Sequence, residues 1–298
     1  SRQIWFGHRI PVWYKNKEIY CGTEAPSPSG WVQDPDVLDT WFSSALWTFS
    51  TLGWPEKTRD LETYHPTSFM SPAYEILNLW VSRMILMSTF HLGQAPFKLV
   101  LIHGLVRNKE GKKFSKSLAN GINPFDMIEK YGADAMRMGL LVGSAIGSDI
   151  RFDESKVKGY KNFANKIWNI TRFVMENLGA TLAEEENLTE ADRELIKELD
   201  SIVKDVTEDM DNYRLHLATE KIYHYVWDRF ASQIIEDSKP IFKGDHAEAK
   251  HSRRTVLLKI LTTSLKLLHP FMPFVTEELW SLIPRKGEKL LMIESWPE

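Results

Sequence analysis

Two lysines and two serines share one short loop, and their spacing suits the chemistry of phosphates. Residues 111–117 read Gly-Lys-Lys-Phe-Ser-Lys-Ser and follow the apolar run of residues 99–102. Lysine ammonium groups act as compact point charges and serine hydroxyls add hydrogen bonds, so a strand that leads into such a loop can hold a polyphosphate. A lysine-rich loop on its own is more often a solvated turn. The assignment therefore depends on the sequence around the loop.

The surrounding sequence resembles class I aminoacyl-tRNA synthetases, whose nucleotide loop reads Lys-Met-Ser-Lys-Ser. Residues 113–117 match that loop with Phe114 in place of Met, and this side chain should pack against the body of the protein while the lysines face the phosphates. Residues 1–11 resemble the return into the catalytic domain after the inserted editing domain. Residues 36–47 resemble the valine-specific branch rather than the isoleucine-specific one, which typically has Val-Trp-Phe-Asp-Ser-Gly there. The resemblance covers essentially the whole chain.

The resemblance implies a two-step reaction on valine, ATP with Mg²⁺, and tRNA(Val). Valine attacks the α-phosphate of ATP to give valyl-adenylate and pyrophosphate, and the acyl group then passes to the terminal adenosine of the tRNA. Lys113 and Lys116 would neutralise the β- and γ-phosphates as pyrophosphate leaves, and Lys116 would carry the greater weight. Ser115 and Ser117 would complete the ATP-binding loop. No general base is needed, because the carboxylate of valine is already ionised.

The resemblance also implies an adenosine site and an amino-acid pocket. Glu75 aligns with an acidic residue that bonds the ribose hydroxyls, although a carboxylate at a helix start is equally often a dipole partner. His103 and Gly104 resemble the pair that borders the adenine, where glycine allows close backbone contact. Phe6 and Trp41 are candidate walls of the valine pocket, where a methylene-sized fit gains only ~1–3 kcal/mol. Their alternative role is as ordinary core aromatics.

One motif of the family is expected to lie outside this chain. His91-Leu92-Gly93-Gln94 imitates the family's His-Ile-Gly-His signature, but it closes a predicted helix and Pro96 follows. We therefore interpret it as a helix stop. The histidine motif and the editing domain would belong to the N-terminal half of the same enzyme, and this chain alone would be inactive. The alternatives are an isoleucine-specific fragment and a non-catalytic tRNA-binding module derived from a synthetase.

The elements that must position these residues divide the chain near residue 153. Apolar spacing predicts a helix over residues 73–91, and the run at 99–102 then reads as a parallel strand. Residues 1–153 are thus predicted as α/β, half of a doubly wound unit. The resemblance implies that they are the second half of a Rossmann-like nucleotide-binding domain and include the stem-contact region.

Residues 154–298 show only helical spacing, which predicts an antiparallel bundle. The resemblance implies that this bundle is the anticodon-binding domain. Its expected helices include one capped by Thr189 and one that ends before Pro240. Phe271, Phe274 and Trp280 are expected in its core, and His269 is expected to make a hydrogen bond rather than to catalyse. Lys250, Arg253 and Arg254 form the candidate tRNA contact, for which a solvated helix start is an equal alternative.

Bulk composition narrows the class of protein further. The 298 residues carry a net charge of -3, which argues against a chain coated in basic residues for indiscriminate nucleic-acid binding. A single cysteine, Cys21, excludes a disulfide framework and a multi-cysteine zinc site, so we expect no structural metal. No uncharged apolar stretch is long enough to cross a bilayer. These features are typical of a cytoplasmic enzyme that does not enter a membrane.

Overall fold

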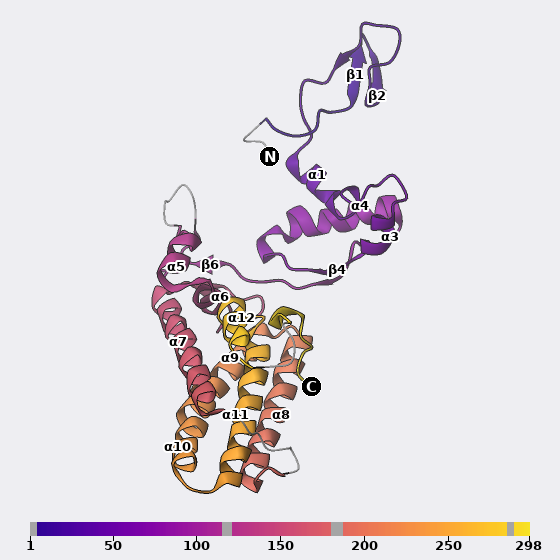
Figure 1. Cartoon of the computed structure of the whole chain (residues 1–298). Coiled ribbons are helices and arrows are strands. Elements are labelled where there is room, and N and C mark those ends of the chain that lie inside the picture. Colours follow the sequence, from indigo (N-terminus) through magenta and orange to yellow (C-terminus); the bar gives the residue numbers. More distant parts are fainter. Residues whose placement is uncertain (1–4, 115–120, 180–186, 285–288) are drawn as a thin grey trace. The chain divides into compact units, whose positions relative to one another are not determined.

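The computed structural model describes residues 5–114, 121–179, 187–284 and 289–298. The chain forms two compact units, Ser1–Gly104 and Leu105–Glu298 (Figure 1). Each unit has elements and buried residues of its own, and each is described by itself.

The first unit begins with a small antiparallel sheet. Strands β1 (Val12–Lys15), β2 (Glu18–Cys21) and β3 (Val32–Gln33) pair in the order β2-β1-β3. Asn16 adopts a left-handed backbone with φ of 55°, which suits the tight turn between β1 and β2. Every residue of β2 is exposed, so this sheet buries little apolar surface.

Helices and a parallel strand pair make up the rest of the first unit. Helices α1 (Thr40–Ala45), α2 (Trp47–Ser50) and α3 (Arg59–Tyr64) precede β4 (Thr67–Met70), and the chain then passes through 3₁₀ and π turns (Tyr74–Ile76 and Leu77–Val81) into α4 (Ser82–Leu92). Strand β5 (Phe97–Val100) pairs with β4 in parallel. This crossover confirms the predicted helix and parallel strand, with the strand two residues earlier than expected. Gly93, at φ of 72°, ends α4 in the left-handed region, as the helix-stop interpretation required.

The second unit starts with a short parallel pair and two helices. Strands β6 (Val106–Arg107) and β7 (Ile150–Arg151) pair in parallel, and between them lie α5 (Pro124–Tyr131) and α6 (Ala133–Leu141). Asn123 caps α5, because its side chain accepts a hydrogen bond from the Phe125 amide, and Pro124 occupies the first helical turn.

Long helices then form a bundle that confirms the predicted all-α second part. They are α7 (Glu154–Asn177), α8 (Glu190–Asp211), α9 (Leu215–His224), the π-helical segment η4 (Tyr225–Ile234), α10 (Ile235–Lys243), α11 (Ala247–Leu268) and α12 (Pro273–Ser281). A 3₁₀ turn at Leu291–Ile293 follows. Figure 1 shows α7, α8 and α11 running side by side. Thr189 caps α8 as predicted, and residues such as Phe163, Ile222, Leu257 and Ile260 fill one continuous core.

Two local predictions in the bundle are wrong. The helix does not end before Pro240, because α10 continues through it to Lys243 while Phe242 packs against the core. This packing offsets the lost amide hydrogen bond. Phe274 is not a core residue, since 66% of its side chain is exposed, whereas Phe271 and Trp280 are buried as predicted.

Candidate functional site

The first limb of the predicted phosphate loop is a fixed turn. The Asn108 amide donates to the Lys112 carbonyl at 3.0 Å, and the Asn108 side chain accepts from the Lys112 amide at 2.7 Å. Gly111 makes the turn possible with φ of 79°. Lys113 follows directly and is exposed. Its backbone forms an isolated antiparallel β-bridge with Arg107. Ser115, Lys116 and Ser117 lie outside the described residues. The structure therefore describes the start of the loop, up to Phe114.

Asp149 holds the base of this loop, and the sequence analysis missed it. Its carboxylate pairs with the Arg107 guanidinium and accepts a hydrogen bond from the Leu105 amide at 2.7 Å. Arg107 in turn donates to the Gly111 carbonyl at 3.3 Å. Asp149 thus connects the start of β7 to both ends of β6. The available signal was an acidic residue just before a short strand, but the sequence did not show that β7 pairs with the strand that leads into the loop.

The candidate adenosine residues meet at one edge of the β4–β5 pair. Backbone hydrogen bonds join the segments beyond the two strands: the Tyr74 amide donates to the His103 carbonyl at 3.4 Å, and the His103 amide donates to the Pro72 carbonyl at 3.0 Å. Glu75 and His103 are therefore on adjacent segments, and both are exposed. This is the carboxyl end of the parallel strands, where ligands bind in open α/β sheets. Gly104 follows directly, and its carbonyl contacts His103 Nδ1 at 2.8 Å.

The candidate amino-acid residues lie on neighbouring segments of the first unit. The segment after Phe6 runs beside the one that leads into α1, because the Leu38 amide donates to the His8 carbonyl at 2.8 Å. Gly7 permits this approach, since a Cβ there would lie 2.3 Å from the Leu38 carbonyl oxygen. Phe6 is 76% exposed, so it is not a core aromatic within the described residues. Trp41 is half-buried in the first turn of α1, which Asp39 caps.

The candidate tRNA contact at the start of α11 is largely occupied by structural interactions. Arg253 is buried, donates to Asp192 at 2.5 Å and to Ser238 at 3.0 Å, and cannot reach a phosphate from there. Arg254 donates to the Asn177 carbonyl at 2.8 Å, which ties α11 to the end of α7. Lys250 is half-buried. Among the described residues of the bundle, it is the one of the three predicted residues for which no hydrogen bond or ion pair is seen. Burial on the inner face of α11 thus disfavours Arg253 as the predicted contact, which stays a prediction.

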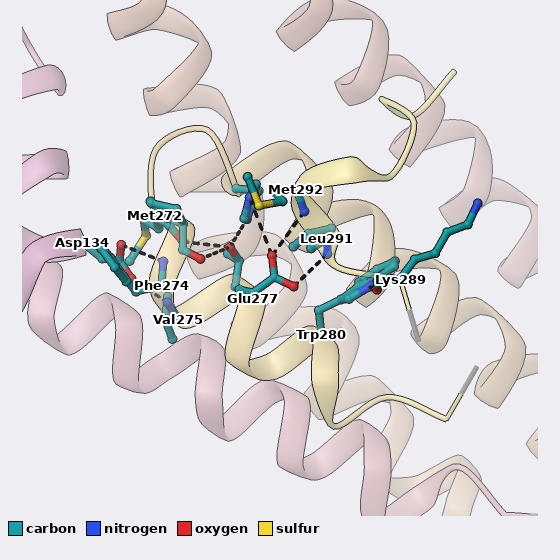
Figure 2. Close-up of polar contacts among 12 residues, drawn as sticks. Asp134, Met272, Phe274, Val275, Glu277, Trp280, Lys289, Leu291 and Met292 are labelled. Atoms are coloured by element: carbon teal, nitrogen blue, oxygen red, sulfur yellow. Dashed lines mark hydrogen bonds and ion pairs between the residues drawn. The ribbon is translucent and has the colours of Figure 1, made fainter. Parts of the chain in front are cut away.

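Residues of α6 hold the N-terminus of α12 through hydrogen bonds. Asp134 of α6 accepts hydrogen bonds from the Val275 amide at 2.7 Å and the Phe274 amide at 3.2 Å (Figure 2). Burial raises the pKa of the Asp134 carboxyl, while these two amides oppose the rise. Arg137, one turn later, donates to the carbonyls of Pro270 and Phe271. These contacts couple α6 to the bundle.

The other side of α12 holds the end of the chain. Glu277 accepts from the Leu291 amide at 2.8 Å and the Met292 amide at 3.2 Å, and the Trp280 indole donates to the Lys289 carbonyl (Figure 2). His269 Nδ1 lies 2.8 Å from the Thr276 hydroxyl, and burial lowers the pKa of its imidazole. His269 is thus a hydrogen-bonded structural histidine, as expected.

The described residues hold no group of three or more His, Cys, Asp or Glu side chains that could bind a metal ion. None of the helices seen in those residues is long and apolar enough to span a membrane.

Comparisons with known proteins agree with this arrangement. Residues 27–153 match the family of class I tRNA synthetases for Ile, Leu, Met and Val, and residues 192–298 match the anticodon-binding domain of tRNA ligases. A valine--tRNA ligase from Clostridium tetani is 47% identical over 100% of this chain and 35% of its own length. One from Enterococcus faecalis is 50% identical over 99% of this chain and 34% of its own.

Solved structures show the same fold at lower identity. A leucyl-tRNA synthetase from Agrobacterium radiobacter, in complex with tRNA and an adenylate analogue, aligns with a TM-score of 0.78 at 18% identity, over 98% of this chain and 41% of that one. A Mycobacterium tuberculosis methionyl-tRNA synthetase with methionyl-adenylate aligns with a TM-score of 0.71 at 21% identity, over 91% of this chain and 53% of that one. The chain spans about a third of the length of its curated relatives. By these matches, residues 27–153 belong to the class I tRNA synthetase family and residues 192–298 to the anticodon-binding domain of tRNA ligases, and the whole chain is similar in sequence to part of valine--tRNA ligases.

Proposed function

We propose that this chain supplies the phosphate loop and the RNA-binding bundle of an enzyme that attaches valine to tRNA(Val) through valyl-adenylate. The observation that carries the proposal is the 47% identity to a valine--tRNA ligase along the whole chain. Class I chemistry of this kind needs charge stabilisation rather than a general base. The fixed turn at Gly111 and the exposed Lys113 beside Arg107 suit that role.

In this proposal the loop acts on pyrophosphate as it leaves. Lys113 and Lys116 meet the β- and γ-phosphates of ATP, which enters with Mg²⁺, and Ser115 and Ser117 add hydrogen bonds. Asp149 acts through Arg107 by fixing the base of the loop. A loop held at one end can close over ATP without losing the position of its first lysine.

The first unit would bind adenosine and valine. Glu75 accepts the ribose hydroxyls and His103-Gly104 border the adenine, since both lie at the carboxyl end of β4 and β5. Phe6 and Trp41 wall the pocket for the valine side chain. If so, Trp41→Ala reduces the preference for valine over isoleucine, and equal losses with both amino acids would make Trp41 a packing residue.

Partners follow from the same proposal. The bundle binds tRNA(Val), and the N-terminal half of the enzyme supplies the paired histidines that hold ATP from the other side. The reaction takes place in the cytoplasm, where the tRNA is charged.

The test uses a hybrid enzyme in which this chain replaces the matching part of Clostridium tetani valine--tRNA ligase. Lys116→Ala should slow valine-dependent pyrophosphate exchange about a hundredfold, as loss of one donor to developing charge does, and should leave valine affinity nearly unchanged. The matched control is Lys204→Ala, which removes an exposed lysine on α8. Equal losses in valine affinity and turnover would contradict the role of Lys116.

A further inference from the structure

A pocket in the second unit belongs to none of the sites above. It has a volume of about 430 Å³ and lies where the end of α6, the first half of α7 and the end of α9 meet. Its lining includes Val142, Lys156, Tyr160, Glu220, Tyr223 and His224. The volume falls within the ~300–1,000 Å³ of sites that take small molecules or parts of larger ones.

Aromatic rings form a rigid wall of this pocket. The Tyr223 ring stacks on Trp227 with centroids 6.0 Å apart and planes 20° apart, and it meets Tyr160 edge-on at 5.7 Å. The ring of the buried Phe163 packs edge-on against the Tyr223 ring, with the two centroids 4.7 Å apart. Three neighbours thus fix the Tyr223 side chain, which is only half-buried itself. A pre-oriented ring of this kind loses little conformational entropy when another flat group stacks on it.

Two lysines of α7 lie at this wall. Lys156 lines the pocket, and Lys166 lies beside the Trp227 ring. Lys166 Nζ lies 5.5 Å from the centroid of the Trp227 ring, and Asp228 orients the exposed His224 imidazole at 2.8 Å. Cations beside stacked aromatic rings are the combination that proteins use to bind single-stranded nucleic acid.

Two further features open the pocket and shape it. A Cβ on the exposed Gly159 would meet nothing within 4 Å, so this lining residue leaves the pocket wall clear. The π-helical segment η4 begins at Tyr225, directly after Tyr223 and His224. Such segments are rare and are frequent at functional sites, because they change the direction in which nearby side chains point. Glu220 adds the one carboxylate of the lining, an acceptor for an amino group.

We infer that this pocket binds a single unpaired base of an RNA, which stacks on Tyr223 while Lys156 and its neighbours contact the adjoining phosphates. The inference rests on the proposed function and deepens it by locating a contact for the RNA. The buried Arg253 cannot supply such a contact, whereas the pocket offers a ring face, cations and a hydrogen-bond acceptor together. A carboxylate acceptor favours bases with an exocyclic amino group, namely adenine, cytosine and guanine.

The test measures binding of the 298-residue chain to two fluorescent RNAs by anisotropy. One is a hairpin with an unpaired loop, and the other is a blunt duplex with the same number of phosphates. Tyr223→Ala should weaken hairpin binding about tenfold, as loss of one stacking ring does, and should leave duplex binding unchanged. Tyr223→Phe should bind as the parent does, because it keeps the ring. Trp168→Ala, which removes a 43%-exposed ring elsewhere on α7, is the matched control.

The RNA affinities of the variants distinguish failure of the pocket from failure of the proposed function. Equal hairpin affinity for Tyr223→Ala and Trp168→Ala, with unchanged melting temperatures, would overturn the pocket and leave the proposed function standing. A chain that binds neither RNA, nor a tRNA(Val) transcript, would remove the RNA-binding role of the bundle itself. If Tyr223→Ala unfolds, the parent chain is photocrosslinked to a hairpin with 4-thiouridine in its loop. Adducts at Tyr160 or Tyr223 support the inference, and adducts confined to other helices overturn it.

Discussion

The two units of this chain bury their apolar side chains to very different extents. The first unit has a small core around Met70, Val81, Met84 and Phe97, and it leaves Phe6 and Phe90 more than three-quarters exposed. The second unit has one continuous core that joins most helices from α6 to α12. The candidate adenosine and valine residues thus lie on a lightly packed scaffold, and the helical bundle is the more tightly packed part.

The exposed apolar side chains of the first unit fit its place in the proposed enzyme. In the proposed enzyme, the rest of the catalytic domain would cover exposed aromatic side chains such as Phe6 and Phe90. The bundle differs in its packing, since α7, α8 and α11 bury their apolar faces against one another. The comparison predicts that substitutions in the bundle will affect stability far more than comparable ones in the first unit.

The largest contrast should come from two phenylalanines. Phe163→Ala leaves a cavity in the bundle core and should cost about 4 kcal/mol, whereas Phe90→Ala on the surface of α4 should stay within about 0.5 kcal/mol. Hydrogen exchange read by mass spectrometry measures the two units separately, which a single unfolding curve would not. Similar losses of protection in both variants would remove the contrast.

A second contrast lies between two arginine ion pairs within the bundle. Arg253→Ala leaves the Asp192 carboxylate buried without its partner and should cost about 3 kcal/mol. Arg172→Ala breaks an exposed pair with Glu176 and should cost about 0.5 kcal/mol or less. Urea midpoints of the bundle helices, followed by circular dichroism, test both variants. A mild effect of Arg253→Ala would return that residue to the candidate RNA contacts.

A smaller contrast lies between two buried aspartates, whose pKa values shift in opposite directions on folding. Each unit of pKa shift corresponds to ~1.4 kcal/mol of unfolding free energy. Burial raises the pKa of Asp134. Burial would raise that of Asp209 too, but Lys221 and Arg214 donate hydrogen bonds and lower it overall. The contribution of Asp134 to stability is therefore present below its unfolded pKa of about 3.8 and is lost as pH rises through its folded pKa. The contribution of Asp209 is present above about pH 3.8 and is lost as pH falls through its folded pKa.

Carboxyl carbon NMR titration gives the folded pKa of each aspartate directly. Unfolding free energies measured between about pH 3 and pH 6 should also respond in opposite ways to Asp134→Asn and Asp209→Asn. Shifts of the two carboxyls in the same direction would contradict the hydrogen-bond assignments at Asp209 and at the start of α12.

The sequence predicted those parts of the fold that depend on local patterns. Thr189 and Gly93 mark helix ends through backbone chemistry, and the parallel β4–β5 pair follows from a helix between two apolar runs. Roles that depend on partners distant in sequence were missed. Arg253 reads as a surface charge until Asp192 lies beside it, and Asp149 reads as a loop residue until β7 pairs with β6. The pocket at Tyr223 was missed because its lining comes from three helices that only the fold brings together.

In the proposed enzyme, this chain provides one part of a valine-activating site that it shares with another part of the enzyme. The most direct test is valine-dependent exchange of labelled pyrophosphate into ATP. It is measured for the chain alone, for the remaining part of Clostridium tetani valine--tRNA ligase alone, and for the two together. We expect exchange only in the mixture, with valine and not with isoleucine at equal concentration. Robust exchange by the chain alone, or none in a mixture whose parts associate, would contradict it.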